Sequence, residues 1–197
     1  MFQWIRRLYD RVLALSGHPK AGYYLAGISF LESSIFPIPP DVLLLPLCLA
    51  KREKAIKLAL ICTFFSVLGG AFGYVLGFSA FDTVGQPILE FYGVMARYDT
   101  FAAWYQEQGP WVVFVAGFTP IPYKVITISA GVFHFNFAVF LVLSVLSRGL
   151  RFGMEALFIR IYGEKAMTLI DRHFNLLTIA GGILFVGGFL VLKFLVH

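Results

Sequence analysis

The sequence predicts an all-α integral membrane protein, and three observations support this fold class. Of the 197 residues, 59% are hydrophobic and 14% are charged, whereas about 25% of residues are charged in an average soluble domain. The apolar residues form runs long enough to cross a bilayer, which takes about 20 residues of helix. Two of these runs are interrupted by clusters of prolines. We therefore expect a single membrane domain over residues 1–197, in which some helices span the bilayer and others are broken.

The chain begins with an amphipathic segment, residues 1–16, whose apolar positions recur at helical spacing opposite Arg6, Arg7 and Arg11. This pattern is typical of a helix that lies at the membrane surface. The remaining expected elements are a broken apolar stretch (21–50), a transmembrane helix (58–81), a polar outer segment (82–108), a second broken stretch (110–133), a transmembrane helix (135–158), an interfacial helix (161–173) and a last transmembrane helix (174–196).

Three glycines mark one face of the first span. Gly69, Gly73 and Gly77 are spaced four residues apart in a charge-free run, so they lie on one side of a helix. Small residues at this spacing let the backbones of two membrane helices approach closely. We expect this face to pack against another helix.

The two proline clusters resemble each other and indicate an internal repeat. Residues 37–42 read PIPPDV and residues 120–125 read PIPYKV, so four of six positions are identical. Proline removes a backbone donor and disfavours helix in the residue before it. We expect these prolines to break each stretch into a hairpin; they are Pro37, Pro39, Pro40, Pro120 and Pro122.

Charge predicts how the hairpins enter the membrane. The segments before and after the first broken stretch each carry a net charge of +3, and residues 82–108 carry −3. Basic loops stay in the cytoplasm, so the first stretch should enter and leave on that side. The second should then enter from the outside, which gives two re-entrant hairpins in an inverted repeat. Irregular backbone at this depth requires burial in protein or a wet cavity.

Three charges lie inside the broken stretches, namely Glu32, Asp41 and Lys124. An unpaired charge at mid-membrane costs about 2.5–3.5 kcal/mol on insertion scales. Asp41 and Lys124 occupy matching repeat positions, so we expect them to pair. Three interpretations stay open: a structural lock, a pathway with carboxylate proton sites and a lysine that binds headgroups, or groups that merely reach the interface.

A second set of charges follows the second stretch. Arg148, Arg151 and Glu155 are spaced three and four residues apart and so share a helix face. Arg148 is a candidate for binding a phosphate in a wet cavity, since a guanidinium binds phosphate with two hydrogen bonds. Arg151 and Glu155 are further candidates, with anchoring at the interface as the expected role of Arg151.

Other site types have little support in the sequence. Cys48 and Cys62 lie in apolar runs and the four histidines are scattered, so we expect no metal site, no disulfide and no cofactor. The N-terminus lacks the pattern of a cleaved signal peptide. No expected soluble part is large enough to bind nucleic acid. The sequence leaves open whether the chain forms a homo-oligomer.

The proline-containing motifs are similar to those of a known family. Residues 32–41 (ESSIFPIPPD) and 118–124 (FTPIPYK), followed by Ala130 and Gly131, resemble the DedA family, whose domain is also called VTT or SNARE-associated-Golgi-like, and in particular its YqaA-like branch. The resemblance covers about residues 20–160. The acidic pair of the family maps onto Glu32 and Asp41. Of its basic pair, one position maps onto Lys124 and the other falls near Phe118.

The resemblance implies a multi-pass protein of the bacterial inner membrane that moves lipids between leaflets, as a translocase or scramblase for phospholipid or polyprenyl-phosphate headgroups. Membrane lipids are then its partners, and some members of the family depend on the proton gradient. A proton-coupled transporter of small solutes or ions is the alternative. A lipid-modifying enzyme is the weakest alternative, because Met154 stands where a lipid-phosphatase motif starting at Ser147 and Arg148 has histidine. We expect no enzyme activity.

Overall fold

The structure, a computed structural model, describes residues 20–34, 39–91, 95–119, 123–163 and 165. These residues form helices and short connections, and no strand occurs in the described ranges. The elements are α2 (Ala21–Ser34), α3 (Asp41–Ala50), the 3-10 turn η1 (Arg52–Lys54), α4 (Ala55–Ala80), the π-helical turn η2 (Phe81–Gly85), α5 (Gln86–Phe91), α6 (Met95–Phe118), α7 (Tyr123–Val132) and the helix Phe137–Gly163.

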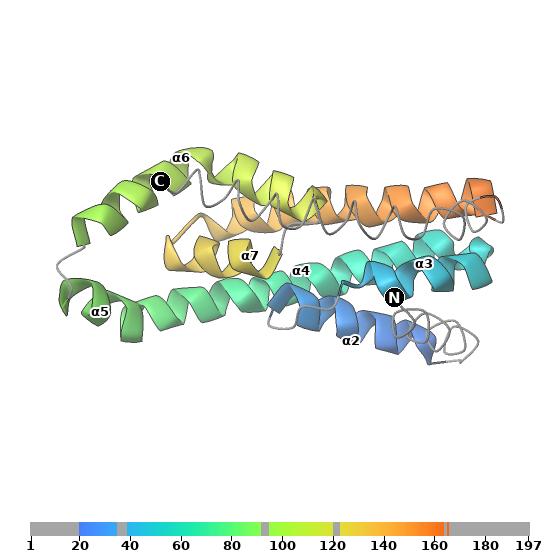
Figure 1. Ribbon diagram of the computed structural model, residues 1–197, viewed down its shortest axis with the longest axis horizontal. Coiled ribbons are helices and arrows are strands. Elements are labelled where there is room, and N and C mark those ends of the chain that lie inside the picture. The colour runs from blue at the N-terminus through green and yellow to red at the C-terminus, as the bar shows by residue number, and fades with distance from the viewer. Residues whose placement is uncertain (1–19, 35–38, 92–94, 120–122, 164, 166–197) are drawn as a thin grey trace, which may run out of the picture.

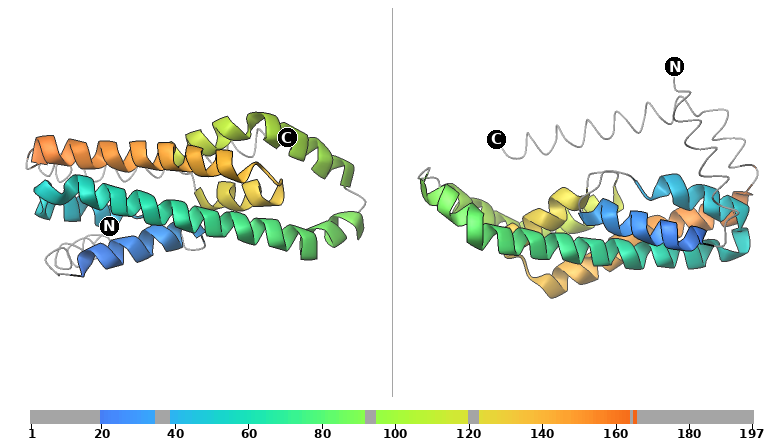
Figure 2. Two further views of the ribbon diagram at one scale, coloured as in Figure 1. Left: turned by 180° about the vertical axis from the view of Figure 1, so that it is seen from behind. Right: turned by 90° about the horizontal axis from the view of Figure 1, so that it is seen from below.

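The helices form an elongated bundle around α4, which runs along most of its length (Figures 1 and 2). α2 runs from one end of the bundle to its middle, and α3 runs back to the same end. α6 runs from the opposite end toward the middle, and α7 runs back from there. The helix Phe137–Gly163 lies beside both pairs, and the middle of the bundle is therefore where the ends of four helices meet.

Two helices in the described part of the chain are long and apolar enough to cross a membrane, Arg52–Ala80 and Phe137–Gly163. They correspond to the expected spans 58–81 and 135–158. On α4, Leu60 and Phe64 are exposed, and they lie on a different side of the helix from Gly69 and Gly73. A helix that is apolar on both its buried and its exposed faces is typical of a membrane span.

The bounds of the polar segment differ from those expected. The sequence placed a boundary at Pro110, whereas α6 is one helix from Met95 to Phe118 with Pro110 in its interior. Proline in a helix interior costs one hydrogen bond and strains the preceding turn. The preceding Gly109 is buried, and a Cβ atom there would lie 2.7 Å from the ring of Phe135. The helical turn that contains Pro110 thus packs tightly against the Phe135 ring.

The face of α4 that carries Gly69, Gly73 and Gly77 packs against two helices, α2 and α7. A Cβ atom at Gly69 would lie 2.2 Å from the carbonyl oxygen of Phe30 in α2, and one at Gly77 would lie 2.1 Å from that of Ile128 in α7. Gly73, between them, lies next to Thr127 of α7. The expected packing face is confirmed, and it holds both broken segments against the same span.

Alanine at these glycines should therefore destabilise the fold. We expect Gly69→Ala and Gly77→Ala each to lower the unfolding temperature in detergent by several degrees, since a methyl group would push backbone away from backbone. Gly153→Ala is the matched control, because no described residue lies within 4 Å of its Cβ position and alanine favours helix by about 0.5–1 kcal/mol over glycine. Equal unfolding temperatures for the three variants would contradict this packing.

The expected surface helix (1–16) and last span (174–196) lie outside the described residues, as does most of the expected interfacial helix (161–173).

Candidate functional site

The middle of the bundle contains a buried ion pair between α2 and the helix Phe137–Gly163. Arg148 Nη2 donates to both carboxylate oxygens of Glu32, at 3.1 and 3.3 Å. The side chain of Arg148 is 3% exposed and that of Glu32 is 13% exposed. Glu32 also accepts a hydrogen bond from the Ser33 hydroxyl at 2.9 Å. One guanidinium thus ties the end of α2 to a residue 116 positions later in the chain.

A second ion pair lies one turn along the same helix. Arg151 Nη2 binds Asp41, the first residue of α3, and Nη1 donates to the carbonyl oxygen of Thr119 at 2.7 Å. Its Nε lies 3.5 Å from the carboxylate of Glu155. Arg151 therefore joins the start of α3 to the end of α6, and the anchoring role expected for it at the interface stays a prediction.

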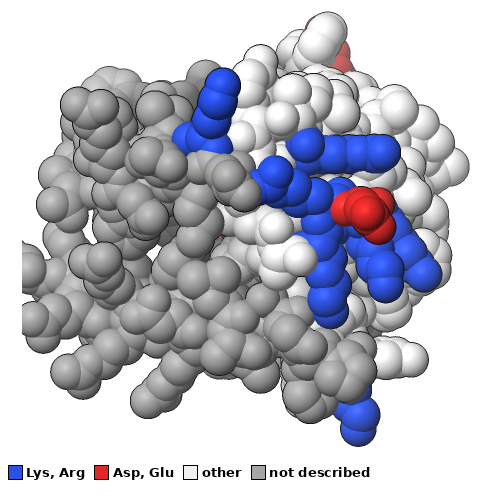
Figure 3. Space-filling model, turned by 90° about the vertical axis from the view of Figure 1, so that its right-hand side faces the viewer, with Lys and Arg blue, Asp and Glu red and all other residues white. Residues whose placement is uncertain are grey.

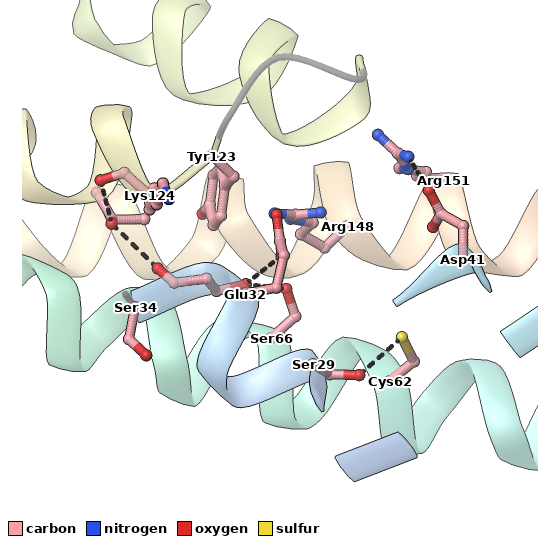
Figure 4. Close-up of polar contacts among 12 residues, drawn as sticks. Ser29, Glu32, Ser34, Asp41, Cys62, Ser66, Tyr123, Lys124, Arg148 and Arg151 are labelled. Carbon is pink, nitrogen blue, oxygen red and sulfur yellow. Dashed lines mark hydrogen bonds and ion pairs between the residues drawn. The ribbon is translucent and has the colours of Figure 1, made fainter. Parts of the chain in front are cut away.

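An aromatic ring contacts Arg148 in the middle of the bundle. The guanidinium carbon of Arg148 lies 4.1 Å from the centroid of the Tyr123 ring, a cation–π contact. Tyr123 is fully buried at the start of α7, and its hydroxyl donates to Ser144. Figure 4 shows Tyr123 standing between Lys124 and the pair of Glu32 and Arg148.

The expected pair of Asp41 and Lys124 does not form. Asp41 is bound by Arg151, and in Figure 4 Lys124 lies at the opposite end of the row of charges, beyond Tyr123. The reason is geometric: α3 packs on the first half of α4, in a cluster with Leu58 and Cys62, whereas α7 packs near Gly77. Matching positions in two similar motifs therefore lie apart along α4.

Hydroxyl and thiol groups line the contact of α2 with α4. Ser29 Oγ lies 3.1 Å from Cys62 Sγ, and Ser33 Oγ lies 2.7 Å from Ser66 Oγ. All four side chains are buried. Hydrogen bonds of this kind between membrane helices contribute about 0.6 kcal/mol each on average. They fix the register of α2 on α4 and so position Glu32.

Of the prolines expected to shape the hairpins, two lie in the described residues. Pro40 is buried and precedes α3 with a helical φ of −66°, and Pro39 is exposed. Pro37, Pro120 and Pro122 lie outside the described residues. A further buried proline, Pro46, lies within α3.

The end of the bundle that holds η1 is basic (Figure 3). Lys54, Lys57, Arg160 and Lys165 are exposed in this part of the chain. Arg52 packs against Gly163, where a Cβ atom would lie 2.1 Å from the guanidinium carbon. Gly163 has a positive φ of 39°, which glycine adopts readily.

Several residues of the site were not predicted from the sequence. Tyr123, Ser144 and the hydroxyl pairs of α2 and α4 contribute polar groups to the site, yet each is a common residue in an apolar run. Ser29 with Ser33, and Cys62 with Ser66, are spaced four residues apart. This spacing on two apolar helices is the signal that could have found them.

In the described residues no group of three histidine, cysteine or acidic side chains is placed to hold a metal ion. The site is instead a buried row of carboxylates, guanidiniums and hydroxyls.

Comparison with known families identifies the fold that carries this row. Residues 38–160 match the VTT domain, which is the domain of the DedA family. The chain is a VTT-domain protein. The match includes Asp41, Lys124, Arg148, Arg151 and Glu155, and the predicted family membership is confirmed.

Two relatives cover much of this VTT-domain protein. It is 37% identical to an uncharacterized protein of Haemophilus influenzae over 94% of this chain and 96% of the relative. It is 39% identical to an uncharacterized protein of Histophilus somni over 74% of this chain and 75% of that relative. No solved structure matches. The family and the apolar helices make this a membrane protein with a transporter-like role.

Proposed function

We propose that this VTT-domain protein moves lipids between the leaflets of the bacterial inner membrane and acts on phosphate-bearing headgroups of phospholipids or polyprenyl phosphates. The observation that carries the proposal is a pair of arginines inside the bundle, the buried Arg148 and the partly buried Arg151, each held by a carboxylate from a proline-broken segment. Such groups are costly in a membrane and mark pathways for substrates, ions or protons. The lipid itself is not chemically changed.

In the structure, carboxylates bind the two guanidinium groups that would bind the phosphate of a substrate. Guanidinium binds carboxylate and phosphate with similar two-pronged geometry. A headgroup phosphate can therefore replace Glu32 on Arg148 once that carboxylate is protonated or displaced. Proton binding and headgroup binding would then favour each other, which links transport to the proton gradient.

The paths of the helices support re-entrant hairpins in an inverted repeat. α2 begins and α3 ends at the basic end of the bundle, whereas α6 begins at the opposite end and α7 turns back part of the way toward it (Figure 1). In the proposed topology the basic end faces the cytoplasm. The two hairpins meet at the row of charges near the bilayer midplane, as in other carriers with inverted repeats.

Reconstitution in vesicles tests the proposal. We expect vesicles that contain the protein to expose fluorescent phospholipids or a polyprenyl phosphate to a membrane-impermeant quencher faster than protein-free vesicles. A neutral lipid without phosphate, such as a labelled diacylglycerol, is the control for bilayer leakage, and its rate should not depend on the protein. Proton-driven flux of a small solute without movement of any lipid would favour the alternative, a small-solute transporter.

The same vesicles test the topology. Single cysteines at Lys20 and Lys54 should react with an impermeant thiol reagent from one side, and a cysteine at Glu107 from the other. The native Cys48 and Cys62 are buried and should react slowly. Reaction of the first two cysteines from opposite sides would exclude a first hairpin.

A further inference from the structure

Carboxylates outnumber guanidiniums in the buried row of charges. Glu32, Asp41 and Glu155 supply three negative charges if all are ionised, and Arg148 and Arg151 supply two positive charges, so 2 − 3 leaves a net charge of −1. An uncompensated charge away from water is expensive, and a buried group commonly takes up a proton instead. One bound proton would make these five side chains neutral, and Lys124 lies apart from them at the far end of the row.

Lys124 does not neutralise the excess negative charge of Asp41 and Glu155, the two carboxylates that contact Arg151. It lies at the other end of the row, beyond Tyr123 (Figure 4), while Glu155 is one helical turn past Arg151. Among the described residues, the charged groups that interact electrostatically with Glu155 are Asp41, Arg151 and Arg148. The thiols of Cys48 on α3 and Cys62 on α4 also interact with it, and neither adds a positive charge.

The three carboxylates are not equally well bound. Glu32 accepts hydrogen bonds from Arg148 and from Ser33, and Asp41 accepts a charge-assisted hydrogen bond from Arg151. Within the part of the chain that the structure describes, the polar contact of Glu155 is the 3.5 Å approach to Arg151 Nε, which is long for a charge-assisted bond of about 2.7–2.9 Å. Within the described ranges its Oε2 atom is buried and lacks a hydrogen-bond partner, as does Oδ1 of Asp41.

Among the described residues, the row also contains two donors without a hydrogen-bond partner, the Nε atoms of Arg148 and Arg151. Arg148, whose side chain is 3% exposed, has an Nε that no hydrogen-bond acceptor reaches in the part of the chain that the structure describes. The site therefore has unused donor and acceptor capacity at both arginines. Partly filled polar networks are costly, and they suit a site whose partners change during a cycle.

Glu155 is also the member of the row nearest to the basic end. It precedes Gly163 by eight residues, or about 12 Å of helix, and the helix ends there beside Arg52. Its side chain is 25% exposed, compared with 20% for Asp41 and 13% for Glu32. Glu155 is therefore the most exposed of the three carboxylates.

We infer that Glu155 is the proton-exchange group of the carrier on its cytoplasmic side. In the arrangement described here it holds one proton as the carboxylic acid, and it releases that proton when Arg151 leaves Asp41 and becomes its counter-ion. This inference rests on the proposed function for its role in transport. Proton binding by Glu155 itself depends only on the row of charges.

Infrared spectroscopy of the purified protein tests proton binding without any transport. We expect a carboxylic-acid band near neutral pH that shifts when the glutamate carboxyl carbons carry carbon-13, that persists in Glu32→Gln and that is lost in Glu155→Gln. Glu107→Gln is the control, because Glu107 is exposed on α6. If Glu155→Gln does not fold, Glu155→Asp should keep a band that no longer responds to labelled glutamate. A band that survives in Glu155→Gln, or no band in the wild type, would overturn the inference.

Transport then separates this inference from the proposed function. The ratio of the rates of lipid movement with and without an inward proton gradient should fall close to one in Glu155→Gln, whereas it exceeds one in the wild type. A wild type that moves no lipid but shows the Glu155 band would reject the proposed function and keep the proton site. A Glu155→Gln variant that responds to the gradient as the wild type does would reject the exchange role.

Discussion

Replacement of Arg148 by glutamine is expected to lower the free energy of unfolding by about 3–5 kcal/mol, because it leaves Glu32 charged and buried without a partner. The side chain of Arg148 also loses its contact with the Tyr123 ring, 4.1 Å away. The measurement is unfolding by denaturant or heat in detergent, followed by helix content. Arg160→Gln is the matched control, since Arg160 is exposed on the same helix, and it should change stability by less than about 0.5 kcal/mol.

The double variant Glu32→Gln with Arg148→Gln should recover much of the loss. Both side chains are then neutral, so neither leaves an unmatched charge in the bundle. Replacement of a whole buried pair is often far less costly than removal of one partner. If Arg148→Gln were as stable as the Arg160→Gln control, the ion pair with Glu32 would not exist in the folded protein.

Exchange of the charges at Asp41 and Arg151 is expected to give the second large effect. Asp41→Arg places two guanidiniums together, and Arg151→Asp places three carboxylates together, so each should cost several kcal/mol. The double variant should be more stable than the sum of the two losses predicts, by about 1–3 kcal/mol, as found for residues in contact. Recovery should be partial, because Asp41 begins α3 and a positive charge is unfavourable at a helix N-terminus.

Lys124 provides the comparison for this exchange. Asp41→Lys combined with Lys124→Asp should show no such recovery, because Arg151 and not Lys124 binds Asp41. Additive losses for Asp41 with Arg151, and recovery for Asp41 with Lys124, would contradict the described site.

The parts of the fold that depend on local patterns could be predicted from the sequence. The two spans follow from the length of their apolar runs, and the packing face of α4 follows from glycines four residues apart. The grouping of Arg151 with Glu155 on one helix face follows in the same way and is confirmed by their contact. Each of these features involves residues within one helix, where the 3.6-residue period fixes which side chains are neighbours.

The partners in the site could not be predicted, because they depend on where separate helices dock. Glu32 and Arg148 are 116 positions apart, and Asp41 and Arg151 are 110 apart. Their pairing requires the paths of α2 and α3 along α4, which the register of the buried hydroxyl pairs and the close approach of Phe30 to Gly69 determine. Similarity between the two proline motifs indicated a pair between Asp41 and Lys124, but similar motifs need not touch.

The central claim is that Arg148 and Arg151 bind lipid headgroups. The most direct measurement compares lipid movement by the wild type and by the double variant Glu32→Gln with Arg148→Gln in the same vesicles. The double variant should fold and insert, yet move phosphate-bearing lipids at least about tenfold more slowly, since it has lost a phosphate-binding guanidinium and its carboxylate partner. Its rate for the neutral control lipid should equal that of the wild type. A double variant that moves phosphate-bearing lipids as fast as the wild type would contradict the claim.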